Sequence, residues 1–212
     1  MMGRIQMTDL EVVPNLVTIN HRGIVEIKQA IFYRTLPIMV VLLLIMSMPK
    51  QANAQYAEYE TKAGMIYTFG KLVTWPSKAF DSKNKLVLGV LGDDPFGSII
   101  DNVLKNRPVN GRYWEIRRGT SIKELKGSHI IFIGNSYPRD VLKSILDDIY
   151  SKKNSMVLTI GDNIDGFCEL GGIINLTTNL YQLNVTAANN AQLTVDVKLL
   201  NLASDIVPYD NN

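Results

Sequence analysis

The sequence predicts a single α/β domain with a mostly parallel sheet, helices on both faces of that sheet, and a C-terminal edge hairpin. Three observations support this fold class. Short apolar runs rich in β-branched residues alternate with helical patterns along the chain. The run His129–Ile133 is almost continuously apolar, as expected of a strand covered on both faces. Glycines at 166, 171 and 172 then separate short apolar runs, which favours a hairpin near the C-terminal end.

The expected elements alternate regularly along the chain. A first helix begins at Glu58, and Pro76 ends it near Trp75, because proline disfavours the α conformation in the residue before it. Asp94 as N-cap and Pro95 at the first helical position open a second helix. The full series is helix 58–75, strand 85–91, helix 94–104, strand 112–117, a helical turn at 122–125, strand 129–133, helix 138–150, strand 156–160, a hairpin of 173–176 with 181–185, and two helical pieces within 187–203.

The first quarter of the chain has the pattern of a secretory signal peptide. Residues 36–48 form an uncharged apolar run, basic residues precede it, and a small-x-small sequence ending at Ala54 follows. A membrane anchor is the alternative, but a span takes about 20 apolar residues and this run is shorter. We expect a signal peptide over residues 1–54, cleavage after Ala54, and a periplasmic domain over residues 55–212. The long segment before the apolar run favours a true start codon downstream of Met1.

Charge and cysteine content limit the function classes. Of the 22 basic and 20 acidic residues, five and three lie in the expected leader, which leaves 17 of each sign. A neutral domain argues against nucleic acid as a partner, because phosphates demand a basic surface. The nearest basic cluster, Arg112 with Arg117 and Arg118, is better explained as the solvated edge of a strand. The single Cys168 has no intrachain partner, so we expect it to be buried, with a bridge between two chains as the alternative.

The motifs that would indicate catalysis are incomplete. Asp93 and Asp94 resemble the paired acids of a phosphorylated receiver, but the central strand ends in Gly134-Asn135-Ser136, without the carboxylate that accepts the phosphoryl group. That segment also lacks the second glycine of a nucleophile elbow, and His129 precedes its serine in chain order. One histidine and one cysteine after residue 54 make no metal cluster. We therefore expect no enzyme activity, no cofactor and no metal.

Three segments, in this order and spacing, are typical of one bacterial protein family. They are the opening helix with Glu60-Thr61-Lys62-Ala63, Tyr67, Phe69, Val73 and Trp75-Pro76; the strand and turn of residues 88–97; and a later stretch with residues 157–162, Phe167, residues 171–176, Asn184, Ala188, Leu193 and residues 199–203. Through them, nearly all of residues 55–212 resembles the YfiR family of periplasmic proteins.

The resemblance implies an α/β domain that often dimerises and has no known catalysis. The best-understood member of the family represses an inner-membrane diguanylate cyclase by binding its periplasmic sensor domain, and an outer-membrane lipoprotein relieves the repression. By resemblance, we expect a periplasmic regulator that binds and represses a membrane-bound signalling enzyme, either a diguanylate cyclase or a histidine kinase. That member has intrachain disulfides, which the lone Cys168 cannot form, so redox tuning by such a bond is not expected.

The partner-binding face is expected on the opening helix. Tyr59, Tyr67 and Trp75 offer the amphipathic aromatic side chains that are enriched at protein interfaces. Their helical spacing allows a second interpretation, in which the rings form the core face of the helix.

Binding of a small periplasmic ligand is the alternative function. In open α/β sheets, ligands collect at the carboxyl ends of the strands. Asp93, Asp94 and Phe96 lie there, in the turn after the first strand, and the glycines at 171 and 172 would complete such a site. An unrecognised enzyme is a third hypothesis, which the incomplete motifs disfavour.

Overall fold

The computed structural model describes residues 37, 49–80, 84–151 and 155–207. The chain divides into two units, Met1–Gln51 and Ala52–Asn212, and the second contains the α/β domain. The apolar run of the expected signal peptide lies outside the described residues, apart from Pro37. None of the helices in the described part is long and apolar enough to cross a membrane.

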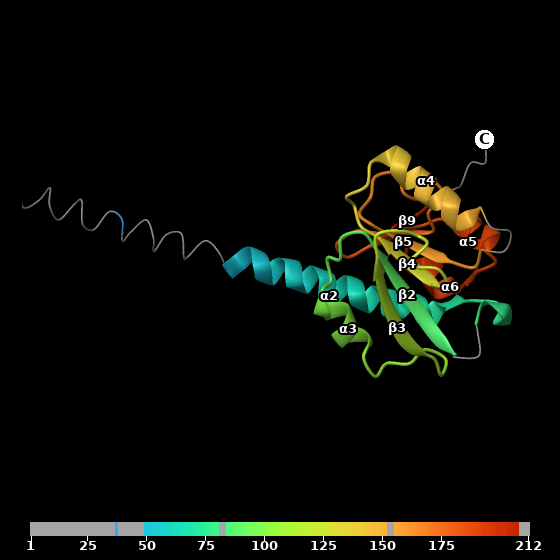
Figure 1. Cartoon of the computed structure of the whole chain (residues 1–212), viewed down its shortest axis with the longest axis horizontal. Coiled ribbons are helices and arrows are strands. Elements are labelled where there is room, and N and C mark those ends of the chain that lie inside the picture. The colour runs from blue at the N-terminus through green and yellow to red at the C-terminus, as the bar shows by residue number, and fades with distance from the viewer. Residues whose placement is uncertain (1–36, 38–48, 81–83, 152–154, 208–212) are drawn as a thin grey trace, which may run out of the picture. The chain divides into compact units, whose positions relative to one another are not determined.

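A seven-stranded sheet, counted over the described residues, forms the centre of the domain in the order β3-β2-β4-β5-β6-β7-β9 (Figure 1). The five strands from β3 to β6 are parallel, β7 runs antiparallel to β6, and β9 is parallel to β7. The strands are β2 (Lys85–Leu91), β3 (Tyr113–Gly119), β4 (Ile130–Ile133), β5 (Leu158–Asp162), β6 (Ile174–Leu176), β7 (Tyr181–Leu183) and β9 (Asp205–Ile206). A separate antiparallel pair joins β1 (Val73–Thr74) to β8 (Thr194–Val195).

Helices cover both faces of the sheet, as predicted. Ile130 and Phe132 of β4 enter one core cluster, and Ile131 and Ile133 enter the other, because successive side chains of a strand point to opposite faces. Residues of α2, α3, α5 and α6 pack in the first cluster, and residues of α4 pack in the second. The helices are α2 (Pro49–Leu72), α3 (Ser98–Leu104), α4 (Arg139–Tyr150), α5 (Val185–Asn190) and α6 (Val197–Leu202), with a short 3-10 helix η1 (Ser77–Ala79).

The predicted fold class is confirmed, and the first helix differs from the prediction at both ends. It begins at Pro49 rather than Glu58, since the intervening alanines, glutamines and lysine are good helix formers. The predicted cleavage site after Ala54 therefore falls within α2. The helix ends at Leu72 because the next two residues leave it to pair with β8, so Trp75 lies beyond the helix.

Two further predictions of detail were wrong. Asp94 does not cap α3: its carboxylate accepts the N–H groups of Phe96 and Gly97 at 2.9 and 3.3 Å, which forms a separate turn before the helix begins at Ser98. The β6–β7 hairpin is present but is not the edge of the sheet, because β9 pairs with β7. A strand of two residues leaves no alternating pattern from which it could have been predicted.

Candidate functional site

A buried ion pair joins the middle of α2 to the carboxyl end of β5. Lys62 and Asp162 are each 2% exposed, and Nζ of Lys62 lies 2.6 Å from Oδ1 of Asp162. The same Nζ lies 2.6 Å from Oε1 of Glu58, and the Tyr59 hydroxyl donates to Oδ2 of Asp162 at 2.9 Å. We call these four residues the α2–β5 charge cluster. It fixes the helix near the carboxyl ends of the parallel strands, where ligands of parallel α/β folds usually bind.

The electrostatics of this cluster hold Lys62 and Tyr59 each in one protonation state. Burial lowers the pKa of Lys62, but hydrogen bonds to Asp162 and Glu58 outweigh it, and the net pKa is raised. Burial and the negative charge of Asp162 raise the pKa of Tyr59. The lysine therefore stays charged and the phenol stays neutral near pH 7. Such groups anchor a helix, whereas a general acid or base needs a pKa near the working pH.

Two of the three predicted ligand residues are already engaged by the protein. Phe96 is 1% exposed and packs edge-on against the rings of Tyr59 and Phe132, with centroid distances of 5.3 and 4.7 Å. Oδ2 of Asp94 accepts a hydrogen bond of 2.6 Å from Nε of Arg118. Asp93 is exposed. The role of these residues in ligand binding stays a prediction.

Gly172, one of the two predicted glycines at 171 and 172, lies against an aromatic ring. A Cβ atom on Gly172 would overlap the ring of Phe167, and one on Gly161 would come within 2.8 Å of it. Phe167 is fully buried between them. Close approach to the Phe167 ring thus accounts for Gly172 and Gly161, whereas Gly171 has a positive φ of 101°.

Cys168 is buried, as predicted. Its Sγ lies 3.8 Å from the carbonyl oxygen of Ile173, and burial raises the pKa of the thiol to about 12. A bridge to a second chain therefore requires the domain to open first.

Ion pairs line the outer strand β3, at the edge of the sheet. Glu115 accepts hydrogen bonds from Lys85 at 2.9 Å and from Arg117 at 2.7 Å, and these lower the pKa of its carboxyl group to about 2. Arg118 bridges Asp94 and Asp101. This agrees with the interpretation of Arg117 and Arg118 as a solvated strand edge.

The three predicted partner residues lie in different environments. Tyr59 belongs to the charge cluster and is partly buried. Tyr67 is also partly buried, and its ring has the Lys71 Nζ at 5.6 Å and the Arg107 guanidinium carbon at 5.8 Å. Trp75 is 7% exposed and packs in the first core cluster. Tyr67, with exposed Lys71 and Arg107 around it, is the one of the three best placed to meet a partner. We call Tyr67, Lys71 and Arg107 the basic aromatic patch.

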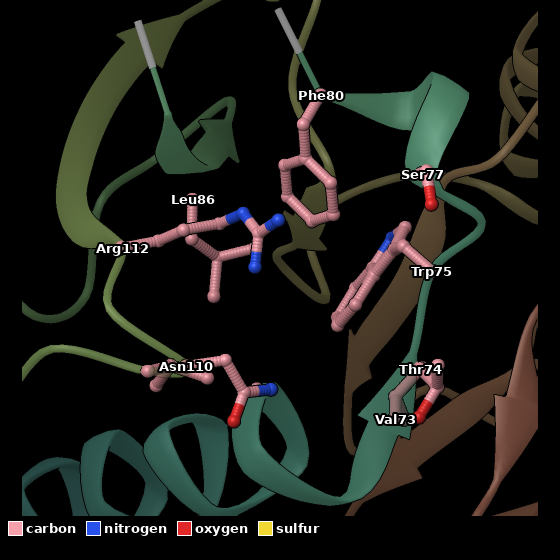
Figure 2. Close-up of a pocket in the computed structure, with 10 residues that line it drawn as sticks. Val73, Thr74, Trp75, Ser77, Phe80, Leu86, Asn110 and Arg112 are labelled. Atoms are coloured by element: carbon pink, nitrogen blue, oxygen red, sulfur yellow. The ribbon is translucent and has the colours of Figure 1, made fainter.

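A cavity of about 120 Å³ lies beyond the end of α2 (Figure 2). Trp75 and Phe80 form two of its walls, and Asn110 and Arg112 contribute polar groups. Sequence reasoning placed Arg112 on a solvated edge, but its guanidinium lies 3.7 Å from the centroid of the Phe80 ring. Metal-binding groups of three or more His, Cys, Asp or Glu side chains are absent from the part of the chain that the structure describes.

Sequence reasoning missed Lys62, Asp162 and Arg112. Glu58 and Lys62 have the spacing of an i,i+4 pair, and Asp162 follows a predicted strand, so local signals for two of these residues existed. No local signal joins Lys62 to a carboxylate 100 positions away, or places Arg112 against an aromatic ring.

Comparison with known protein families agrees with this architecture. The family described as YfiR/HmsC-like matches residues 59–204, from the charge cluster to the residue before β9. The chain belongs to the YfiR/HmsC-like family. No curated protein matches the chain. Membership in the family implies a periplasmic regulator of a diguanylate cyclase and a regulatory rather than an enzymatic role.

Proposed function

We propose that this protein is a periplasmic regulatory protein that binds and represses a membrane-bound diguanylate cyclase. The family match over residues 59–204 carries this proposal, because it covers nearly the whole α/β domain. The charge cluster supports it, since the shifted pKa values of Lys62 and Tyr59 suit a binding domain better than proton transfer. A histidine kinase is the alternative partner of the same kind.

The basic aromatic patch is our proposed contact surface for the partner. Lys71 and Arg107 are exposed, and Tyr67 between them is half-buried. Aromatic rings flanked by cations are enriched at binding hot spots. The two positive charges favour an acidic segment of the sensor domain. Tyr59 and Trp75, the other two residues predicted to bind the partner, belong to the first core cluster and lie outside this surface.

Cyclic-di-GMP measurement in living cells tests the proposal directly. Deleting the gene should raise the cyclic-di-GMP level, and the wild-type gene should restore it. The double variant Tyr67→Ala with Lys71→Glu should fail to restore it, because it removes the ring and reverses one charge. Lys143→Glu is the matched control, since Lys143 is an exposed lysine on α4, which packs in the other core cluster, and pairs only with Asp147 in the described structure. An unchanged cyclic-di-GMP level on deletion would refute the proposal.

Affinity purification from envelope extract identifies the partner. We expect a membrane protein with a periplasmic sensor domain to copurify with the wild-type protein and the Lys143→Glu control, and to be lost with the patch variant. Recovery of a sensor kinase instead of a cyclase would identify a histidine kinase as the enzyme that this protein regulates. Recovery of no membrane sensor protein would contradict the function itself.

Two further parts of the proposal concern assembly. A homodimer and an outer-membrane lipoprotein that relieves repression both follow from the family resemblance. Size-exclusion chromatography with light scattering measures the first, and the same purification from envelope extract reports the second.

A further inference from the structure

The cavity beyond α2 has aromatic and apolar walls and one cationic side chain. Figure 2 shows Arg112 and Trp75 on opposite sides of the cavity, with Phe80 above and Asn110 below. The remaining wall comes from the end of α2, β1 and the start of β2, and none of the lining residues that the structure describes is acidic. Among these residues, the cavity therefore has a positive charge without a carboxylate beside it.

Hydrogen-bond donors in this wall lack acceptors. Nε1 of Trp75 and Nε of Arg112 are buried, and neither has a hydrogen-bond partner among the described residues. The guanidinium of Arg112 makes no ion pair within that part of the chain and contacts the face of Phe80 instead. Buried donors without acceptors cost free energy, and native proteins rarely keep them without a ligand, a water or an ion.

The side chains of Phe80 and Arg112, which line the cavity, are held in place by neighbouring residues. The Phe80 ring stacks on His129 with a centroid distance of 4.6 Å, on an imidazole whose Nδ1 accepts the N–H of Val87 at 3.0 Å. Nε2 therefore carries the proton and donates to the carbonyl oxygen of Ala79 at 3.1 Å. Arg112 follows a tight turn whose two backbone hydrogen bonds, to and from Val109, are each 2.9 Å long. The guanidinium of Arg112 and the ring of Phe80 are thus preorganised before any ligand binds.

We propose that this cavity binds a carboxylate carried on a short apolar stem. The guanidinium recognises the carboxylate, and the aromatic and aliphatic walls receive the stem. A volume of about 120 Å³ is close to the ~150 Å³ of an apolar cavity that accommodates benzene, so the buried group has about six non-hydrogen atoms. Inorganic phosphate fits less well, since the apolar walls cannot replace the hydration of a dianion. This inference does not depend on the proposed function.

Nuclear magnetic resonance titration of the whole exported protein tests the proposal. The chain has two tryptophans, Trp75 in the cavity and Trp114, whose Nε1 already donates to the carbonyl oxygen of Arg107 at 3.0 Å. Butyrate should shift the indole N–H resonance of Trp75 in a saturable way and leave that of Trp114 in place. Butyramide, the neutral amide of the same shape, should bind at least tenfold more weakly.

Two variants test whether the positive charge of Arg112 is needed for butyrate binding. Arg112→Gln should weaken butyrate binding at least tenfold, and Arg139→Gln should leave it unchanged, because Arg139 lies on α4 and donates to the carbonyl oxygen of Asp165, outside the cavity lining. Equal binding of butyrate and butyramide to the wild-type protein would overturn the proposal without any variant. So would a butyrate affinity that Arg112→Gln does not alter, or tighter binding of phosphate.

The carboxylate has two chemical sources, and a second titration distinguishes them. A blocked peptide that contains one glutamate presents the same group as a partner's side chain. Tighter binding of the peptide than of butyrate assigns the cavity to a protein partner. Tighter binding of butyrate assigns it to a free organic acid.

Discussion

Replacing Lys62 by methionine tests how α2 is held on the domain. Methionine keeps most of the length and the apolar stem of the side chain, but it removes the positive charge. Asp162, which is 2% exposed, then keeps only the hydrogen bond from the Tyr59 hydroxyl. Its carboxylate has to stay buried without a cation or take up a proton. Either outcome destabilises the folded state.

The expected loss of stability is large for a single substitution. Removing one partner of a buried ion pair costs about 3–5 kcal/mol, because the other charge stays buried. Glu58 adds little, since its side chain is 34% exposed and water solvates it. For a chain of this size each kcal/mol shifts the melting temperature by about 2–4 °C, so Lys62→Met should lower it by roughly 6–20 °C.

Thermal and urea unfolding, followed by circular dichroism, measure this loss. Lys143→Met is the matched control, since Lys143 pairs with Asp147 on the exposed face of α4. This substitution should lower the free energy of unfolding by less than about 0.5 kcal/mol. The double variant Lys62→Met with Asp162→Asn should be more stable than Lys62→Met alone, because no charge stays buried. A loss of less than about 1 kcal/mol in Lys62→Met would refute this account of the cluster.

Three further measurements test individual side chains. The pKa of the Glu115 carboxyl group is lowered from 4.5 to about 2, so the stability that its ion pairs contribute is complete above pH 4.5 and is lost as the pH falls towards 2. Glu115→Gln should remove this part of the pH dependence of stability, which is worth less than about 1 kcal/mol at this partly exposed site. Cys168 should resist thiol reagents at neutral pH in the folded protein and react in urea, and rapid labelling of the folded protein would contradict its burial. Gly172→Ala should lower stability by about 1–3 kcal/mol through overlap with a ring, whereas Gly64→Ala, with no atom within 4 Å of the new carbon, should raise it by about 0.5–1 kcal/mol in the same denaturation assay.

Local sequence patterns predicted those parts of the fold that depend on local physics. The strand over residues 85–91 has the predicted bounds, and the predicted hairpin is present as β6 and β7. Pro76 correctly marked the region where α2 ends, because its effect acts on the neighbouring residue. The end at Leu72 and the strand β1 could not be predicted, since both depend on pairing with β8 far along the chain.

The candidate site was harder to predict because its groups meet only in the folded chain. A lysine in a helix is ordinarily solvated, so nothing in the neighbourhood of Lys62 indicates that it is 2% exposed. Asp94 was wrongly predicted to cap the helix, because the choice between a helix and an isolated turn depended on Gly97, whose φ of 50° places it outside the helix. Aromatic spacing alone could not distinguish the buried Trp75 from the more accessible Tyr67.

The cavity and the basic aromatic patch meet at the last turn of α2, which makes coupling between them testable. Gly70 lines the cavity, and its neighbour Lys71 belongs to the patch. The ring of Trp114 lies 2.7 Å from where a Cβ of Gly70 would stand, so this turn is closely packed. If both proposals hold, butyrate should change the affinity for the membrane partner, and the partner should change the affinity for butyrate by the same factor. Biolayer interferometry with and without butyrate measures this factor, and Arg112→Gln should bring it to one. A factor of one in the wild-type protein would show that the two surfaces act independently.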